Sequence, residues 1–193
     1  GPTTVLNAGT LVGTVSGHDG FVFAGNWSSG TGALPYDGTF SRSTDPSASM
    51  VFEIDGAGVA ITHQLYSLGG KFEVCFDGGI NCRVINTRGG ATNLWGYVST
   101  VYAPGVPGVP PSEGRHTVEI RALDISQIRI EAIEVLPTPV GLGPGTYSES
   151  AVELNYLTGY WLPRVLLDSA MGGTYVYANT QGAAIEFIVD GDN

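Results

Sequence analysis

The sequence predicts an all-β fold: an antiparallel sandwich of two sheets, followed by the first strands of a second, similar unit. Short apolar runs rich in Val, Ile, Thr and aromatic residues alternate with clusters of Gly, Pro, Asn and Ser, which is typical of strands joined by turns. No segment has a sustained helical period. A three-part pattern also occurs twice along the chain. Together these features favour a β-sandwich.

The repeated pattern is a Gly-x-Trp, then a Gly-Thr-aromatic triplet, then an aromatic strand that ends in Asp-Gly. The second occurrence lies about 135 residues after the first. The landmarks are Gly25–Trp27, Gly38–Phe40 and Phe52–Gly56 in the first copy, and Gly159–Trp161, Gly173–Tyr175 and Phe187–Gly191 in the second. Because all three keep their spacing, we interpret them as an internal repeat whose second copy is interrupted.

The repeat divides the chain into three segments. Residues 1–136 are expected to form a complete β-sandwich module, and a unit of this size can bury a core. Residues 137–145 mix Pro with Gly and are expected to be a linker. Residues 146–193 are expected to form the N-terminal part of a second, homologous module.

Alternation and turn residues locate the strands. Residues 28–38, rich in Ser and Gly, and 103–114, with four prolines, are expected to be loops, since proline has no N–H for a strand ladder. In 127–135 the residues Ile128, Ile130 and Ala132 alternate with Arg129, Glu131 and Ile133, the period of a one-sided strand. The other expected strands are 3–15, 21–23, 39–43, 49–54, 59–63, 71–76, 82–85, 94–102 and 116–122 in the first unit, and 152–156, 175–177 and 184–190 in the second.

Charge excludes several classes of partner. The formal net charge is -10, and Lys71 is the only lysine. A nucleic-acid or anionic-membrane surface needs clustered Lys and Arg, which are absent from the sequence. No apolar run reaches the roughly 18 residues of a membrane span. We therefore expect no nucleic acid partner and no membrane insertion.

Two cysteines flank an Asp-Gly-Gly turn, Cys75 and Cys82. A hairpin here would bring the sulfurs together, so we expect a disulfide, with two reduced core thiols as the alternative. A zinc site would need two further ligands at matching spacing, and none is evident. A disulfide implies an oxidising compartment, which favours an extracellular or cell-surface location.

The order of motifs resembles the galactose-binding-like jelly-roll modules of secreted and cell-surface proteins. The matching residues are Trp27, Gly38-Thr39-Phe40, Phe52–Gly56 and the run Glu113-Gly114-Arg115-His116-Thr117-Val118-Glu119-Ile120. The resemblance covers about residues 15–136, and its beginning recurs over 147–193. It implies a jelly-roll sandwich in tandem, as glycan binder, adhesion module or structural spacer, so the fold alone does not decide the function.

Aromatic side chains are the ligand-binding candidates. Trp95, Tyr97 and Tyr102 share one strand, and 95 and 97 are expected on the same face. Exposed, they would stack on sugar rings; core burial is the alternative. Tyr36, in the Ser/Gly-rich loop, is a further candidate. Trp27 and Trp161 occupy equivalent repeat positions, which favours a role in the scaffold.

Catalytic and metal motifs are sparse. No Gly-x-Ser-x-Gly elbow, His-Glu-x-x-His or phosphate loop occurs, so we expect no enzyme and no cofactor. His116 is expected to make a structural hydrogen bond. Calcium is the one metal considered, with Asp37 and Asp45 as ligands, although acids beside Gly or Pro are first of all turn residues.

Two functions fit these features. The first is a non-catalytic extracellular binding or adhesion module of a repeat-containing surface protein, with a glycan or another surface protein as partner. The second is a self-assembling subunit of an extracellular filament or surface layer, in which strands of 146–193 are completed by a neighbouring chain, because unpaired strand edges template pairing. Glycan binding and solution size separate the two.

Overall fold

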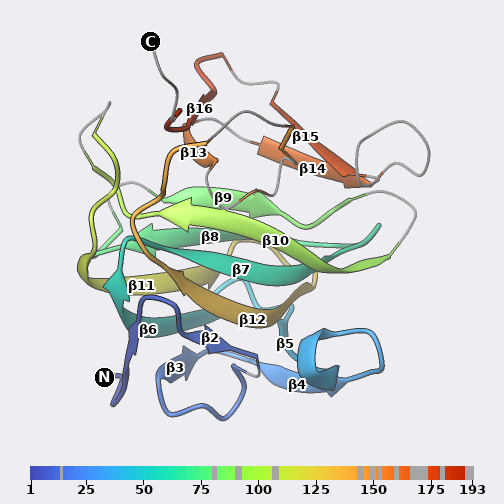
Figure 1. The fold of residues 1–193 in the computed structure, drawn as a ribbon. Coiled ribbons are helices and arrows are strands. Elements are labelled where there is room, and N and C mark those ends of the chain that lie inside the picture. The colour runs from blue at the N-terminus through green and yellow to red at the C-terminus, as the bar shows by residue number, and fades with distance from the viewer. Residues whose placement is uncertain are drawn as a thin grey trace.

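The computed structural model describes residues 1–13, 15–79, 82–89, 93–105, 109–142, 146–147, 151, 154–158, 161–165, 174–178 and 181–189. Within these ranges the chain forms β-strands and one short 3-10 turn, η1 (Tyr36–Gly38). Two large sheets pack face to face (Figure 1). The predicted β-sandwich is therefore confirmed. No helix of the described residues has the length and hydropathy of a membrane span.

The first sheet has eight strands. Strand β6 is central, because it pairs in parallel with β1 and antiparallel with both β3 and β11. The order along the sheet is β1 (Val5–Asn7), β6 (Ser49–Gly56), β11 (Gly114–Ala122), β8 (Lys71–Phe76), β9 (Arg83–Asn86), β14 (Trp161–Val165) and β15 (Thr174–Ala178), with β3 (Phe21–Ala24) also on β6.

The second sheet has six strands, and all its pairings are antiparallel. It forms the site face described below. The order is β10 (Leu94–Tyr102), β7 (Gly58–Leu65), β12 (Ile128–Leu136), β5 (Thr39–Ser43) and β4 (Ser28–Thr31), with β2 (Leu11–Val12) also on β12. Only Ala57 separates β6 from β7, so the chain crosses directly from one sheet to the other.

The core lies between the two sheets. Met50, Phe52 and Ile54 alternate along β6 and are fully buried, as alternation predicts for a strand with one core face. They pack with residues of the facing sheet, including Ile61 and Ile130. Each fully buried side chain of this size contributes about 1.5–3 kcal/mol relative to exposure. This single cluster explains why the alternating segments of the sequence fold as a sandwich.

Two expected elements differ in the structure. Residues 28–31, expected in a loop, form the edge strand β4, which pairs with β5 from Ser28↔Arg42 to Thr31↔Thr39. The segment is Ser-Ser-Gly-Thr and has no large apolar residue, because the side chains of this edge strand are mostly exposed and bury little. The expected strand over 3–15 is instead two short strands, β1 and β2, separated by a turn in which Thr10 N–H donates to the Asn7 carbonyl at 2.9 Å.

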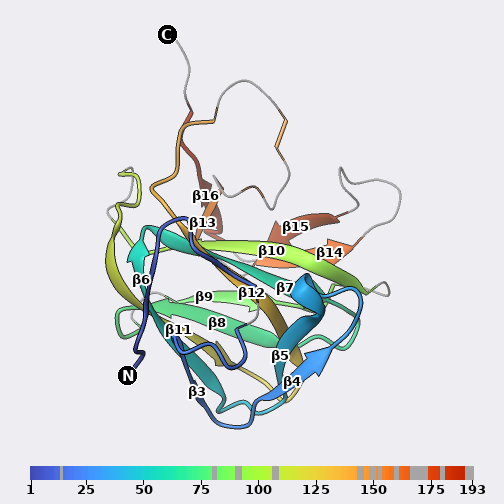
Figure 2. The ribbon, with the colours of Figure 1, turned by 60° about the horizontal axis from the view of Figure 1, so that its bottom comes forward.

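The C-terminal segment repeats two strand pairings of the first copy. In the first copy β3 pairs with β6, and β4 with β5. The counterparts are β13 (Asn155–Thr158) with β16 (Ala184–Glu186), and β14 with β15. These strands lie over the β9–β10 side of the sandwich (Figures 1 and 2), where β14 pairs in parallel with β9 at Trp161↔Ile85. The division into two modules and the linker 137–145 remain predictions, and residues 143–145 lie outside the described ranges.

Trp27 anchors a strand end, as the repeat led us to expect. Its indole Nε1 donates to the carbonyls of Ala24 at 3.1 Å and Ser49 at 3.0 Å. Its ring also packs against Phe23 at 5.5 Å between centroids. The polar atom of the indole is thus used by the scaffold. The side chain of its counterpart Trp161 lies outside the described residues.

Candidate functional site

A bulge in β10 separates two of the predicted ligand-binding residues. Between Leu94 and Tyr97 the register of β10 on β7 shifts, and Gly96 has a left-handed φ of +74°. Beyond the bulge, the Tyr97 ring lies 5.4 Å from His63, on the side of the core. Trp95 instead packs against Phe40 at 4.9 Å. The expectation that 95 and 97 share a face is wrong, because the extra residue of the bulge breaks the period of two.

Tyr97 and Tyr102 are buried, each with 6% exposure. Tyr102 packs in a small apolar cluster with Ala57, Ala60 and Leu136. Neither ring presents a face to solvent, so the three-residue aromatic surface predicted for β10 is reduced to Trp95, which is half-buried. For Tyr97 and Tyr102 the structure therefore agrees with the alternative expectation, which was core burial.

Arg129 of β12 lies at the centre of the remaining candidate site. Its neighbours Ile128 and Ile130 belong to the core, so Arg129 projects from the opposite, outer face of the six-stranded sheet. The carbon Cζ of its guanidinium lies 4.7 Å from the ring centroid of Tyr66, 5.6 Å from Phe40 and 5.7 Å from Trp95. Three rings from three other parts of the chain therefore surround one cation.

Two glutamines fix the Arg129 side chain. Arg129 Nη1 donates to Gln64 Oε1 at 2.7 Å, and Nε donates to Gln127 Oε1 at 2.5 Å. Tyr66, which covers the guanidinium, donates its hydroxyl to the Gln127 carbonyl at 2.5 Å. Burial raises the pKa of the Tyr66 hydroxyl, an effect that the nearby Arg129 charge reduces. The ring positions are thus set by hydrogen bonds as well as by packing.

Glu131 joins two loops to this face. It is wholly buried, yet both carboxylate oxygens accept backbone hydrogen bonds: Oε2 from Tyr36 N–H at 2.8 Å and Oε1 from Gly96 N–H at 3.0 Å. Two sequence candidates far apart in the chain, Tyr36 and Trp95, are therefore held on either side of one carboxylate. Tyr36 is 39% exposed, which leaves part of its ring accessible.

Arg129 and Glu131 are the site residues that the sequence reasoning missed. Both were assigned to the outer positions of an alternating strand. The available signal was the presence of three charged residues, Arg129, Glu131 and Glu134, in an otherwise apolar strand of a chain with 13% charged residues. Charged side chains in such a strand are seldom buried without partners.

A buried Ser–His pair lies elsewhere in the structure. His63 Nε2 is hydrogen-bonded to Ser99 Oγ at 2.8 Å, and both residues face the core. Burial lowers the pKa of His63 to about 4. The other ring nitrogen of His63 is near a backbone carbonyl, at 3.4 Å from the Gln64 oxygen. A substrate has no access to this pair, so its geometry is that of a satisfied polar contact inside the core.

The two calcium candidates do not form one site. Asp37 precedes β5 and Asp45 follows it, so the strand separates them by about 16 Å. Asp45 is a turn residue: it accepts hydrogen bonds from Asn26 N–H at 2.9 Å and from the Ser47 backbone and hydroxyl at 2.9 and 2.6 Å. These bonds lower the pKa of its carboxyl. The expectation of a shared site is wrong because the predicted strand lies between the two acids.

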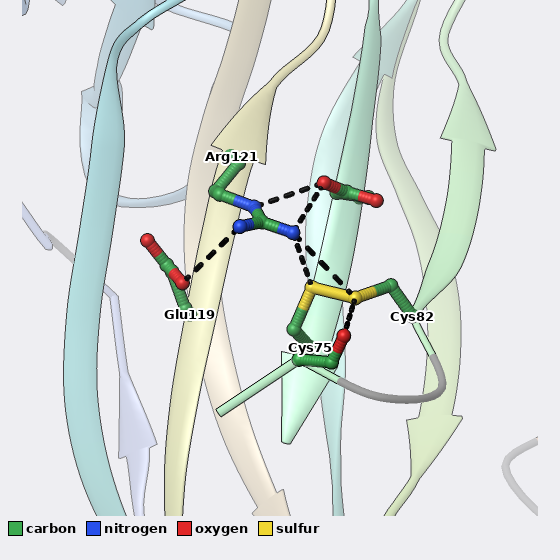
Figure 3. Close-up of a disulfide and its surroundings, with 6 residues drawn as sticks. Cys75, Cys82, Glu119 and Arg121 are labelled. Atoms are coloured by element: carbon green, nitrogen blue, oxygen red, sulfur yellow. Dashed lines mark hydrogen bonds and ion pairs between the residues drawn. A yellow bond between two sulfur atoms is a disulfide. The ribbon is translucent and has the colours of Figure 1, made fainter. Parts of the chain in front are cut away.

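The predicted disulfide between Cys75 and Cys82 is confirmed, with an S–S distance of 2.06 Å (Figure 3). Arg121 covers it: Nη2 lies 3.4 Å from Cys75 Sγ and 3.8 Å from Cys82 Sγ. The same guanidinium pairs with Glu73 at 2.7 Å and with Glu119 at 3.9 Å. Glu73 and the two sulfurs are the only described group with metal-ligand spacing, and the sulfurs are bonded to each other.

His116 makes the structural contact that its position predicted. Its Nδ1 lies 2.6 Å from Asp77 Oδ2, and the Asp77 Oδ1 accepts the backbone N–H of Thr117 at 2.9 Å. Burial acts to raise the pKa of Asp77, but these hydrogen bonds outweigh burial and lower it. The contact closes the turn beside the disulfide and takes no part in the aromatic face.

Comparison with known proteins shows the fold. No family model and no curated protein matches the sequence. A two-domain esterase active on acetylated mannans superposes with a TM-score of 0.50 at 13% identity, over 67% of this chain and 37% of the esterase. The Clostridium stercorarium module CsCBM6-3, solved with cellobiose, gives a TM-score of 0.45 at 12% identity, over 70% of this chain and 99% of the module. A Phanerochaete chrysosporium exo-β-1,3-galactanase gives 0.43 at 10% identity, over 65% and 29%.

Proposed function

We propose that the protein is a non-catalytic, extracellular glycan-binding module. The observation that carries this proposal is the Arg129-centred face, in which Trp95, Phe40 and Tyr66 surround one guanidinium. Sugar rings carry C–H groups on their faces and hydroxyl groups at their edges. Phe40 and Tyr66 are buried, each with 7% exposure, and support the guanidinium from below. The half-buried Trp95 and the 39% exposed Tyr36 offer ring surface for the C–H groups, and Arg129 offers donors for the hydroxyl groups.

The geometry suits recognition better than catalysis. Glu131 holds the backbone of Tyr36 and of Gly96, the residue that follows Trp95, which makes the face pre-formed. A pre-formed site loses less conformational entropy when a ligand binds. The Ser99–His63 pair is buried away from this face, and the Glu131 carboxylate is used by two backbone donors. These features favour binding without bond cleavage.

The resemblance to jelly-roll modules of secreted proteins supports the same proposal. The disulfide Cys75–Cys82 is the kind of cross-link that persists in oxidising compartments. The acidic composition adds solubility without a basic surface for nucleic acid. We therefore assign the module to the cell surface or the extracellular space, with a glycan as its partner.

The test is a glycan array followed by isothermal titration calorimetry of the strongest hit. Trp95→Ala should reduce the affinity at least tenfold, if a sugar ring stacked on the indole gains as much as other rings stacked on aromatic side chains, about 1–3 kcal/mol. Tyr175→Ala is the matched control, since Tyr175 is an exposed aromatic of the C-terminal hairpin. Equal loss in both variants, or no binding to any glycan, would contradict the assignment.

A second candidate function is self-assembly, and one observation favours it. Ile185, Phe187 and Val189 are exposed by 38%, 51% and 67%. Their counterparts in the repeat, Met50, Phe52 and Ile54, are fully buried in the core. A second copy of the chain could cover this apolar stripe. Light scattering over a range of concentrations tests it: the candidate requires a dimer or larger species that Phe187→Glu disperses, and a monomer at all concentrations excludes it.

A further inference from the structure

The positive charge of Arg129 at the candidate site indicates which class of glycan the site binds. We propose that the ligand is an acidic glycan, with Arg129 binding the carboxylate of a uronic acid residue whose ring stacks on Trp95. This inference rests on the proposed glycan-binding function and narrows it to one class of sugar.

Arg129 makes no ion pair with any residue that the structure describes. The chain has 18 acidic residues against 8 basic ones, so acidic partners are plentiful. Other arginines do use them: Arg115 pairs with Glu53 at 2.8 Å, and Arg121 with Glu73 at 2.7 Å. A half-buried guanidinium that has only neutral partners in an acidic protein keeps its full positive charge for a ligand.

The acidic side chains near Arg129 are already used. Glu131, two residues along the strand, accepts the backbone N–H groups of Tyr36 and Gly96. Asp124 accepts the backbone N–H of Ser126 at 2.8 Å. Neither carboxylate forms an ion pair with Arg129 among the described residues. The local structure thus holds its acids away from the guanidinium.

The site also has more donors than acceptors. Arg129 Nε and Nη1 each meet a glutamine oxygen, while Nη2 has no partner in the described part of the chain. Gln64 directs its oxygen at Arg129, which leaves its buried Nε2 without an acceptor among the same residues. The Gln64 amide is buried beneath the guanidinium, so Arg129 Nη2 is the donor that a ligand would meet. A carboxylate has about four acceptor positions and no donor, so it supplies the acceptors that the site needs.

The rings and the two glutamines hold the guanidinium in place before a ligand binds. Trp95, Tyr66 and Phe40 hold the guanidinium between them, so its plane is defined before binding. Arginine recognises carboxylates through a planar fork, which lysine does not have. A uronic acid places a carboxylate at the edge of a ring whose faces are C–H surfaces. It can therefore contact Trp95 and Arg129 at once.

The experiment compares oligogalacturonides and glucuronate-containing oligosaccharides with their methyl esters and with sulfated and neutral oligosaccharides, by calorimetry. We expect the free acids to bind at least tenfold more tightly than the esters, and the affinity to fall with added salt. Arg129→Gln should remove this preference, and Arg129→Lys should restore only part of it. Arg115→Gln is the matched control, because Arg115 is an exposed arginine outside the site, and it should keep the preference.

Each other outcome overturns the inference. Esters that bind as well as acids, with binding sensitive to Trp95→Ala but not to Arg129→Gln, would support a glycan-binding module and remove the acidic specificity. If sulfated sugars bound more tightly than carboxylated ones, the group that Arg129 recognises would be a sulfate and the inferred uronic acid specificity would be wrong. No binding of any sugar by the folded wild-type protein would remove the proposed function as well. Thermal unfolding of each variant confirms that it is folded.

Discussion

Gly96 donates its backbone N–H to Glu131 Oε1 at 3.0 Å, across a separation of 35 residues in the chain. Through this bond a carboxylate of β12 fixes the bulge of β10 that places Trp95 on the outer face. The second oxygen of the same carboxylate fixes Tyr36. The aromatic face therefore depends on a residue that has no ring and that does not touch solvent.

Glu131→Ala is expected to destabilise the fold and to abolish glycan binding. The substitution leaves two backbone N–H groups without their acceptor, and each such loss costs about 1–3 kcal/mol. The free energy of unfolding in urea measures the first effect, and titration with glycan the second. Glu131→Gln, which keeps one carbonyl acceptor, should lose less of both. If Glu131→Ala bound glycan with the wild-type affinity, Glu131 would not position the site.

Stability should fall on acidification because of His63. Burial lowers its pKa from 6.5 to about 4 in the folded protein, so the unfolded chain takes up a proton first. The contribution of His63 is complete above pH 6.5 and is lost as the pH falls from 6.5 towards 4. By linkage this amounts to roughly 2–3 kcal/mol at pH 4.5.

Urea unfolding at pH 7.5 and at pH 4.5 measures this effect in the wild-type protein and in His63→Gln. Glutamine can still bond to Ser99 but does not titrate, so the variant should lack most of the pH dependence between these values. Acidic groups contribute equally to both proteins. An identical pH dependence in the two would show that His63 is not the responsible group.

Removing the disulfide is expected to lower stability by about 2.5 kcal/mol, because Cys75 and Cys82 close a short loop whose entropy is restored to the unfolded chain. The comparison is between the wild type and the double variant Cys75→Ser/Cys82→Ser in urea. A reductant should bring the wild type to the level of the variant. Two free thiols in the native protein, counted by mass after alkylation, would contradict the assigned bond.

Tyr156 is expected to hold the C-terminal strands on the sandwich. Arg83 lies 4.3 Å over its ring and donates Nη1 to the Thr100 carbonyl at 3.0 Å, so β9, β10 and β13 meet at one guanidinium. Burial lowers the pKa of Arg83 to about 10, which leaves it charged at neutral pH. A cation–π contact of this kind contributes about 1–2 kcal/mol.

Tyr156→Leu keeps apolar bulk but removes this contact. Hydrogen exchange in β13 and β16 should become about tenfold faster, with exchange in β6 and β11 unchanged. Tyr175→Leu, in the neighbouring hairpin, should leave exchange in β13 at its wild-type rate. Equal protection of β13 in the wild type and Tyr156→Leu would mean that the strand is held by other contacts.

The sequence could predict what depends on local pattern. Alternation located β6, β7 and β12, and the Asp-Gly-Gly turn located the disulfide. The candidate Trp95 came from its aromatic-rich strand. These features are encoded within a few residues of the element concerned.

The arrangement of the site depends on contacts that no local pattern contains. The bulge at Gly96 moves Tyr97 to the core, and its cause is a bond to Glu131 from another strand. Alternation assigned Glu131 to an outer position, whereas the register shift of β12 between Ile130 and Ala132 buries it. Because both irregularities occur where strands meet, only the assembled sheet shows that Trp95, Tyr36 and Arg129 belong to one face.

Calorimetric titration of the wild-type protein and Trp95→Ala with the strongest glycan from an array tests the central claim most directly. A glycan-binding face predicts one site per chain in the wild type and at least a tenfold weaker affinity in Trp95→Ala, with the unfolding temperature little changed. Wild-type affinity in the folded Trp95→Ala variant would contradict the claim.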